Sequence, residues 1–251
     1  MVVGIVSYLL LANSAGNCPQ CGKYVSQQYI QKLSQVANNY TLADQIGPGV
    51  VQLSGLYSNL PKEINQPPLS FGGKPGILYV GGEFCPYCAV SRWGLIIALM
   101  RFGNFSSFTY MKSSSKDVYA DTPTFSFSNY SYSSSLVHFT AFEIYDRSEK
   151  NITNPNFTPS EEALYSKYAG GIPFIDFENQ SYISGASVSP QLLDGSNWNQ
   201  ILANLTKQNS VQAQAIIGNA NLYTAYICKS NQTLNSTAVA CKQSYIKSII
   251  G

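Results

Sequence analysis

The chain has 251 residues, of which 45 % are hydrophobic and 11 % charged, with a net charge of +2. This length accommodates one medium domain with extensions or two small domains, and the hydrophobic share excludes a disordered chain. The small net charge provides no basic field, so nucleic acid is not an expected partner.

The N-terminal segment is the first feature along the chain. Residues 1–12 are almost wholly apolar and are followed by small and polar residues up to position 17. Twelve residues are too few to span a bilayer, which needs about 20. The segment has the length of the hydrophobic part of a signal peptide but lacks the usual preceding positive charges. We interpret residues 1–16 as the remnant of a signal or of a membrane anchor, with a buried N-terminal helix as the alternative.

Hydrophobic periodicity and turn residues predict alternating helices and strands in the rest of the chain. Ser160 is the expected N-cap of one of these helices, whose first turn carries two glutamates that suit the helix dipole. The predicted elements are a helix within residues 23–46, a buried strand at 77–80, a helix at 89–102, a strand at 105–111, a β-hairpin over 122–146, a helix at 159–169, two antiparallel strands at 172–177 and 181–184, a helix at 197–206, and two helices between 211 and 250.

The clearest chemical motif is Cys85-Pro86-Tyr87-Cys88, between a predicted strand and a predicted helix. Unpaired N–H groups and the helix dipole at a helix N-terminus lower a thiol pKa from about 8.5, and the resulting thiolate attacks disulfides. Cys88, one turn later, can then form the Cys85–Cys88 disulfide, and Pro86 suits the first helical turn. The alternatives are an inert structural disulfide or half of a zinc site. Zinc needs four ligands, and His138 is the only histidine, so no metal is expected.

A second motif, Gly170-Gly171-Ile172-Pro173, opens the predicted strand pair. The order of strand, Cys-X-X-Cys, helix, Ile-Pro, hairpin, glycine and helix resembles the thioredoxin superfamily over about residues 70–207. The resemblance implies that the Ile172–Pro173 bond is cis and that its loop faces the two cysteines. Ile172 and Pro173, with Pro86 and Tyr87, would then bind an extended substrate backbone by β-type pairing.

The chain departs from ordinary thioredoxins near this motif. Phe84 replaces the common tryptophan, and no buried acid on a neighbouring strand is identifiable. Glu83 is either a proton relay or an exposed carboxylate at the rim of the site. Arg92 either pairs with Glu83 or another acid, or lies on a solvated helix face, and Trp93 is assigned to the core.

A closer resemblance covers most of the chain. The stretch from Lys74 to Ala89, together with Arg92-Trp93 and Arg101-Phe102-Gly103, resembles an archaeal family of thioredoxin-like proteins classed as a domain of unknown function. The aromatic segment rich in Ser and Thr and the stretch from Ile217 to Cys228 are also similar. This resemblance implies a membrane-anchored or secreted origin but no particular activity.

The other four cysteines are predicted to form two structural disulfides. Cys18 and Cys21 repeat the Cys-Pro-X-Cys spacing, but no predicted strand precedes them. They form either a local structural disulfide or a second redox pair that relays electrons to Cys85 and Cys88. The residues before Cys18 match a lipid-attachment site poorly. Cys228 and Cys241 enclose a short polar loop, where a disulfide stabilises the fold by about 3 kcal/mol in the loop-entropy model.

Paired cysteines, an uncharged polar surface and many Asn-X-Ser/Thr sequons favour an extracytoplasmic location. Some of these sequons arise by chance in a chain rich in Asn and Ser. The sequons begin at Asn39, Asn104, Asn129, Asn151, Asn156, Asn179, Asn204, Asn231 and Asn235.

These observations predict an α/β, thioredoxin-like fold with an inserted β-hairpin and helical N- and C-terminal extensions. The expected divisions after residue 16 are a helical extension at 17–68, the thioredoxin-like domain at 69–207 and a C-terminal extension at 208–251. The predicted function is an extracytoplasmic thiol–disulfide oxidoreductase that acts on protein thiols and disulfides without a cofactor. The alternative is a non-catalytic surface or binding protein on the same scaffold.

Overall fold

A computed structural model describes residues 18–51, 59–64, 66–152 and 155–250 of the chain. The expected signal or anchor segment at residues 1–16 lies outside these ranges. Within them, no helix combines the length and the apolar character that a membrane crossing requires.

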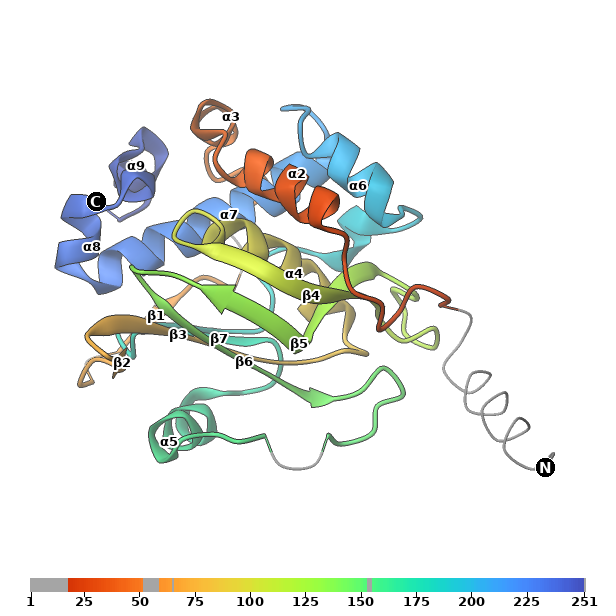
Figure 1. Cartoon of the computed structure of the whole chain (residues 1–251), viewed down its shortest axis with the longest axis horizontal. Coiled ribbons are helices and arrows are strands. Elements are labelled where there is room, and N and C mark those ends of the chain that lie inside the picture. The colour runs from red at the N-terminus through yellow and green to blue at the C-terminus, as the bar shows by residue number, and fades with distance from the viewer. Residues whose placement is uncertain (1–17, 52–58, 65, 153–154, 251) are drawn as a thin grey trace.

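The described chain folds into a mixed α/β structure (Figure 1). The strands are β1 (Lys62–Glu63), β2 (Ser70–Phe71), β3 (Lys74–Gly82), β4 (Asn104–Lys112), β5 (Pro123–Ser133), β6 (His138–Tyr145), β7 (Phe174–Phe177) and β8 (Ser181–Ser184). The helices are α2 (Gln27–Ala37), α3 (Tyr40–Ile46), α4 (Pro86–Leu99), α5 (Pro159–Tyr168), α6 (Trp198–Asn204), α7 (Val211–Ser230), α8 (Gln232–Thr237) and α9 (Ser244–Ile250), with short 3-10 helices η1 (Pro190–Leu193) and η2 (Val239–Lys242).

The central strand of the main sheet is β3, which carries the predicted apolar run. It pairs in parallel with β6 on one side and antiparallel with β7 on the other, so that Tyr79 lies between Ala141 and Ile175. Beyond β7 come β8 and then β1, and β2 forms a hairpin with the start of β3. Because helices cover both faces of β3, its residues are apolar without alternation.

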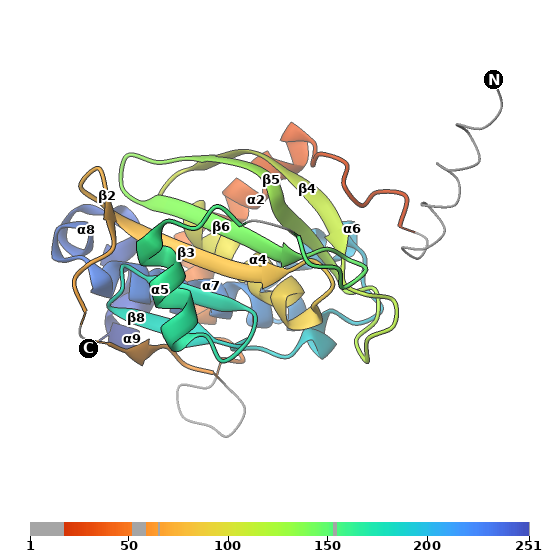
Figure 2. The same ribbon diagram turned by 90° about the horizontal axis from the view of Figure 1, so that it is seen from below.

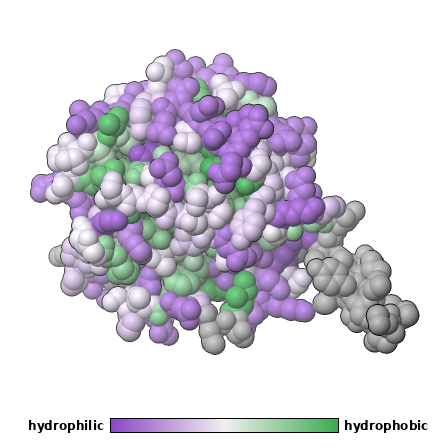
Figure 3. Space-filling view, in the orientation of Figure 1, coloured by the Kyte–Doolittle hydropathy of each residue, from purple (hydrophilic) through white to green (hydrophobic). Residues whose placement is uncertain are grey.

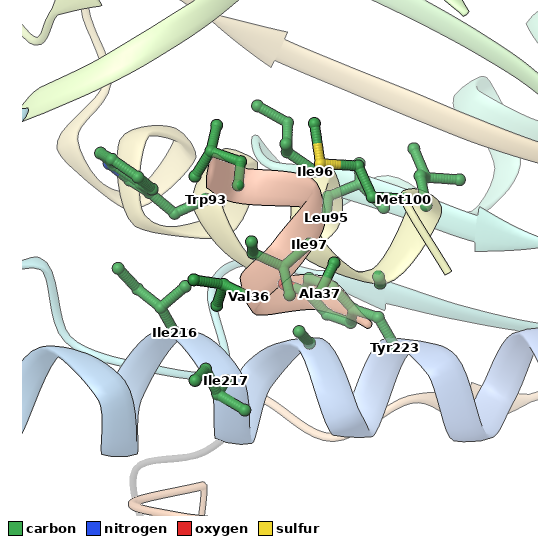
Figure 4. Close-up of a cluster of buried hydrophobic side chains, with 14 of the residues drawn as sticks. Val36, Ala37, Trp93, Leu95, Ile96, Ile97, Met100, Ile216, Ile217 and Tyr223 are labelled. Atoms are coloured by element: carbon green, nitrogen blue, oxygen red, sulfur yellow. The ribbon is translucent and has the colours of Figure 1, made fainter. Parts of the chain in front are cut away.

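Helices α4 and α7 cover one face of this sheet and α5 covers the other (Figures 1 and 2). Helix α4 is buried along almost its whole length, which explains why its residues are apolar on every side. Figure 4 shows Trp93 and Ile97 of α4 close to Ile216 and Tyr223 of α7 and Val36 of α2. Polar residues cover most of the face seen in Figure 3.

The prediction of a β-hairpin over residues 122–146 is wrong. Strand β5 pairs antiparallel with β4 in a separate two-stranded sheet, whereas β6 joins the main sheet beside β3. Ser134 directs the chain between the two sheets: its hydroxyl accepts the N–H groups of Leu136 and Val137 at 2.9 and 3.2 Å and donates to the Phe102 carbonyl. The alternation of apolar and polar residues identifies the buried side of a strand, but it does not identify the strand with which it pairs.

Three helix predictions also change. The predicted helix within 23–46 is two helices, because Asn39 caps a new helix by accepting the N–H of Leu42. The N-cap of α5 is Thr158 and not Ser160, since the Thr158 hydroxyl and the Glu161 carboxylate form a reciprocal capping box. The C-terminal tail holds three α-helices, α7 to α9, where two were predicted.

The N- and C-terminal helical extensions meet at two glycines. A Cβ atom at Gly218 in α7 would lie 2.5 Å from the Pro48 carbonyl oxygen, and one at Gly49 would lie 2.0 Å from the carbonyl oxygen of Gln214. Both obstacles are backbone atoms. The missing side chains therefore allow the loop after α3 to contact the backbone of α7 directly.

We expect Gly218→Ala to lower the free energy of unfolding by about 1–3 kcal/mol, because the added methyl group separates two backbones although alanine favours a helix. Denaturant unfolding measures this change. Gly170→Ala is the matched control, since the nearest atom to a Cβ at Gly170 is the Ser184 hydroxyl at 3.5 Å. Equal stabilities of the two variants would contradict the backbone contact.

Candidate functional site

The predicted motif at residues 85–88 lies where β3 passes into α4. Cys85 is the N-cap of α4, and its Sγ atom accepts the backbone N–H of Cys88 at 3.2 Å. Pro86 begins the helix, where its missing N–H costs no hydrogen bond. The sulfur of Cys85 therefore takes the place of a capping oxygen at the positive end of the helix dipole.

The two cysteines are free thiols with different environments. Cys85 is 6 % exposed and Cys88 is fully buried. The hydrogen bond with the Cys88 thiol lowers the pKa of Cys85 most, and the Cys88 backbone N–H and the charge of Arg92 lower it further, against the effect of burial. Burial raises the pKa of Cys88 well above its usual value, and the hydrogen bond with Cys85 adds to this rise. Cys85 is thus the more acidic thiol of the pair and Cys88 the less acidic one.

A buried ion pair lies one turn beyond Cys88. Nη1 of Arg92 in α4 contacts both carboxylate oxygens of Glu143 in β6, at 3.0 and 2.9 Å, and both side chains are fully buried. The same nitrogen lies 3.2 Å from the Gly82 carbonyl oxygen and 3.2 Å from the Tyr79 hydroxyl. Arg92 therefore joins the helix that bears the cysteines to two strands of the sheet.

Gly81 provides the space for this contact. It lies opposite Glu143 in the parallel register, and a Cβ atom at Gly81 would lie 2.0 Å from the Tyr79 hydroxyl oxygen. The Tyr79 side chain therefore extends over Gly81 towards Arg92. A side chain at position 81 would displace the hydroxyl from the buried network.

Burial opposes the charge on Arg92 most strongly, but Glu143, Tyr79 and the two thiols together outweigh it and raise the Arg92 pKa, so the guanidinium remains charged. Burial also raises the pKa of Glu143, and Arg92 opposes that rise. The pKa of the Tyr79 hydroxyl is raised well above its usual value, chiefly by burial. Within this network, the positive charge of Arg92 lowers the pKa of both thiols.

The structure decides between the alternatives for two charged residues, and for Arg92 it bears out the pairing with an acid other than Glu83. Glu83 is buried and not exposed at the rim, because its Oε1 accepts the hydroxyl groups of Ser126 at 2.6 Å and Ser128 at 2.9 Å. Arg92 pairs with Glu143 and not with Glu83, and it is not on a solvated helix face. Strand β5, which supplies both serines, covers Glu83.

Aromatic side chains surround the exposed side of the motif. Tyr87 is 44 % exposed, and its ring meets Tyr119 edge-on at 6.1 Å. Phe84 meets Tyr145 edge-on at 5.7 Å, and its carbonyl oxygen accepts the N–H of Ser114 at 2.7 Å. The segment between β4 and β5 thus contributes to the rim of the site.

The Ile172–Pro173 peptide bond is cis, as the thioredoxin resemblance implies. These residues precede β7, whose Phe174 pairs with Val80 near the end of β3. A Cβ atom at Gly82 would lie 3.0 Å from Cδ1 of Ile172, so the Ile172 side chain lies against the end of β3 that leads to Cys85. Sequence positions about 90 residues apart are therefore brought to one site.

The other predicted residues lie elsewhere. Both expected disulfides are present, between Cys18 and Cys21 and between Cys228 and Cys241. Trp93 is fully buried and belongs to the core, as predicted. In the part of the chain that the structure describes, no three His, Cys, Asp or Glu residues are grouped as a metal site.

Sequence reasoning missed Tyr79, Tyr119, Glu143 and Tyr145. Glu143 is the one acid between residues 122 and 145 of the predicted hairpin, which was the available signal that it has a buried partner. Its partner was identifiable only from the parallel pairing of β3 and β6. Nothing in the local sequence indicates that Tyr119 reaches Tyr87.

These features define a mixed α/β protein with a central mixed sheet and an asymmetric pair of thiols at a helix N-terminus. The chain belongs to the family described as Domain of unknown function (DUF929), whose model matches residues 61–167 and 160–229. The matched region contains the cysteine motif, the ion pair and the Ile172–Pro173 bond. No curated protein and no solved structure matches the chain.

We expect Arg92→Met to raise the pKa of Cys85, because it removes the nearby positive charge, and Glu143→Gln to lower it, because Arg92 then loses its counter-charge. The rate of Cys85 alkylation as a function of pH measures both shifts in the reduced protein. Arg92→Met also leaves Glu143 buried without its partner, which costs about 3–5 kcal/mol of stability.

Arg101→Met is the matched control for this experiment. Arg101 is also buried, but its guanidinium donates to Thr224, Asn221 and Tyr245. This variant should lose stability without a change in the Cys85 pKa. If the Arg92 and Glu143 variants leave the alkylation profile unchanged, the ion pair does not tune the thiol.

Proposed function

We propose that this chain is an extracytoplasmic thiol–disulfide oxidoreductase with a thioredoxin-like fold. The observation that carries the proposal is the unequal pair of thiols at the start of α4, one with a lowered and one with a raised pKa. An exchange reaction needs one cysteine that attacks and a second that is held in reserve. A purely structural disulfide does not require two thiols that differ in pKa.

The arrangement of the elements around the motif supports the proposed fold. Along the chain they follow as β3, α4, β6, α5, β7 and β8, with the β4–β5 sheet inserted between α4 and β6. In the sheet, β3 lies between parallel β6 and antiparallel β7, and β8 follows β7. The order of β3, the cysteines, α4, Ile172-Pro173 and the β7–β8 hairpin is the order on which the resemblance in sequence rests.

The proposed reaction proceeds through a mixed disulfide. The Cys85 thiolate attacks one sulfur of a substrate disulfide, and the other substrate sulfur leaves as a thiolate. Cys88 then loses its proton and attacks Sγ of Cys85, which releases the second substrate thiolate and forms the Cys85–Cys88 disulfide. The substrate has gained two electrons and the protein has lost two, and the reverse sequence oxidises a substrate dithiol.

Glu83 is the candidate proton relay for Cys88. Glu143 is already paired with the Arg92 guanidinium, whereas Glu83 accepts hydrogen bonds from two neutral serine hydroxyls.

The proposed substrates are proteins with exposed disulfides or thiols. Pro86, Tyr87, Ile172 and Pro173 are proposed to bind the substrate backbone, and the exposed ring of Tyr87 provides an apolar contact beside Cys85. No cofactor is part of the proposed reaction, since the dithiol itself carries the two electrons.

The experiment is a redox titration of the dithiol in glutathione buffers, with alkylation and mass analysis of Cys85 and Cys88. We expect reversible formation of their disulfide within the glutathione range. A Cys88→Ser variant should capture a disulfide-containing model protein as a covalent complex through Cys85, and a Cys85→Ser variant should capture none, since Cys88 is fully buried.

The burial of both thiols favours a second candidate function, a binding protein on the same scaffold. A dithiol that does not respond to the glutathione buffers, and a Cys88→Ser variant that captures nothing, would support that function and reject catalysis. The partners would then be found without any covalent link to Cys85.

The extracytoplasmic location is proposed from the two disulfides and the sequons, with the N-terminal apolar segment as the proposed signal or anchor. The described structure divides the sequons into two groups. Asn179 and Asn231 use their side-chain amides in hydrogen bonds to the Pro67 carbonyl and the Glu178 carboxylate, and Asn204 donates to Gln212. The sequon residues with exposed side chains are Asn39, Asn104, Asn129, Asn151, Asn156 and Asn235.

We expect the folded protein from a secreting, glycosylating host to carry glycans at exposed sequons such as Asn104 and Asn129 and none at Asn179 or Asn231. Peptide mass analysis before and after glycan release identifies the sites. Asn104→Gln should remove one glycan from the folded protein, whereas Asn179→Gln should remove none. A folded, secreted chain without any glycan would leave the sequons as chance matches.

A further inference from the structure

The chain contains two Cys-Pro-X-Cys pairs in opposite redox states. Cys85 and Cys88 are thiols, whereas Cys18 and Cys21 form a disulfide. We propose that Cys18–Cys21 is a second redox centre, which exchanges electrons with the Cys85–Cys88 pair of another copy of the chain. This inference rests on the proposed function of Cys85 and Cys88.

The two disulfides of the structure differ in what they can stabilise. Cys228 and Cys241 are 13 positions apart and almost fully buried between α7 and η2, where they restrain a loop. Cys18 and Cys21 are three positions apart and partly exposed. Because a cross-link removes more entropy from the unfolded chain when it closes a longer loop, the shorter disulfide restrains the unfolded chain less.

The turn that holds Cys18 and Cys21 does not depend on their bond. The N–H of Cys21 donates to the Cys18 carbonyl at 3.1 Å, as in a reverse turn. The N–H of Gly22 donates to the Tyr110 carbonyl, and the N–H of Tyr110 donates to the Lys23 carbonyl, both at 2.9 Å. These bonds attach the turn to β4, so the cysteines can change redox state while the turn keeps its place.

The turn lies at the end of the molecule that bears Cys85. It is attached near the C-terminal end of β4, and the segment that follows β4 contacts Phe84 and Tyr87. In Figures 1 and 2, the red N-terminal segment and the connection from β4 to β5 lie at the same end of the molecule. The two cysteine pairs therefore lie toward the same end of the molecule.

A surface cavity of about 530 Å³ adjoins the turn. It is lined by Gln20 and Lys23 of the turn and by Tyr24, Tyr110 and Trp198. Tyr24 is 64 % exposed. Tyr24 thus exposes an aromatic ring beside this disulfide, as Tyr87 does beside Cys85, and polar side chains that include Asn197 and Asn199 complete the lining of the cavity.

The exchange is balanced without another reagent. The Cys85 thiolate of one copy attacks a sulfur of the Cys18–Cys21 disulfide of the second copy, and the other sulfur leaves as a thiolate. Cys88 of the first copy then loses its proton and attacks Cys85, which forms Cys85–Cys88 and releases Cys18 and Cys21 of the second copy as thiols. One disulfide is consumed, one is formed, and two electrons move.

Two variants of the full chain separate the centres. The acceptor is Cys85→Ser/Cys88→Ser with Cys18–Cys21 oxidised, and the donor is Cys18→Ser/Cys21→Ser with Cys85 and Cys88 reduced. They are mixed without any other redox reagent, alkylated at intervals and analysed by mass. We expect the thiols lost from the donor to appear in the acceptor mole for mole, and the same final ratio when the starting states are reversed.

An acceptor that lacks Cys18, Cys21, Cys85 and Cys88, and so retains only Cys228–Cys241, is the matched control and should gain no thiols. A donor that also carries Cys88→Ser should form a covalent heterodimer through Cys85. If the donor reduces oxidised glutathione but not the acceptor, the second redox centre is rejected while the proposed function stands. If the donor reduces neither, the proposed function fails as well.

Discussion

The buried contact between Arg92 and Glu143 is the constraint around which the candidate site is organised. It crosses from α4 to β6 and fixes the helix that carries both cysteines against the strand that leads to them. A charge pair is costly to bury unless its hydrogen bonds are satisfied. Here Tyr79, the Gly82 carbonyl and the Phe127 N–H take part, while Nη2 of Arg92 has no hydrogen-bond partner among the described residues. The absence of a side chain at Gly81 makes room for these groups. One small residue in β3 thus permits both the packing and the electrostatics of the site.

The sequence was sufficient to predict the strand, the cysteine motif and the helix, because each depends on short-range signals. An apolar run between glycines, a proline suited to the first helical turn and a terminal glycine are all local. The two peripheral disulfides were predicted for the same reason, from cysteines close together in the chain. The cis bond at Pro173 was instead implied by the resemblance to thioredoxins.

The rest depends on pairings between distant segments, which a single sequence does not specify. Strands β5 and β6 are neighbours in the chain with similar alternation, yet Ser134 turns the chain between them into a different sheet. The environments of Glu83 and Glu143 follow from that change, because β5 covers the first and β6 carries the second. An error about one strand pairing therefore becomes an error about the burial of two acids.

The segment from Ser113 to Thr122 has a consequence for how this family can diversify. The N–H of Ser113 donates to the Thr122 carbonyl, and the N–H of Thr122 donates to the Ser113 hydroxyl, so the two ends of the segment are tied together. The residues between them include Tyr119, which borders the site, but none that belongs to β3 or α4. Substitutions at residues 115–120 leave the bond from the Ser114 N–H to the Phe84 carbonyl in place, so the rim of the candidate site can change without moving the sulfur atoms. The rim and the two cysteines thus belong to separate stretches of the chain.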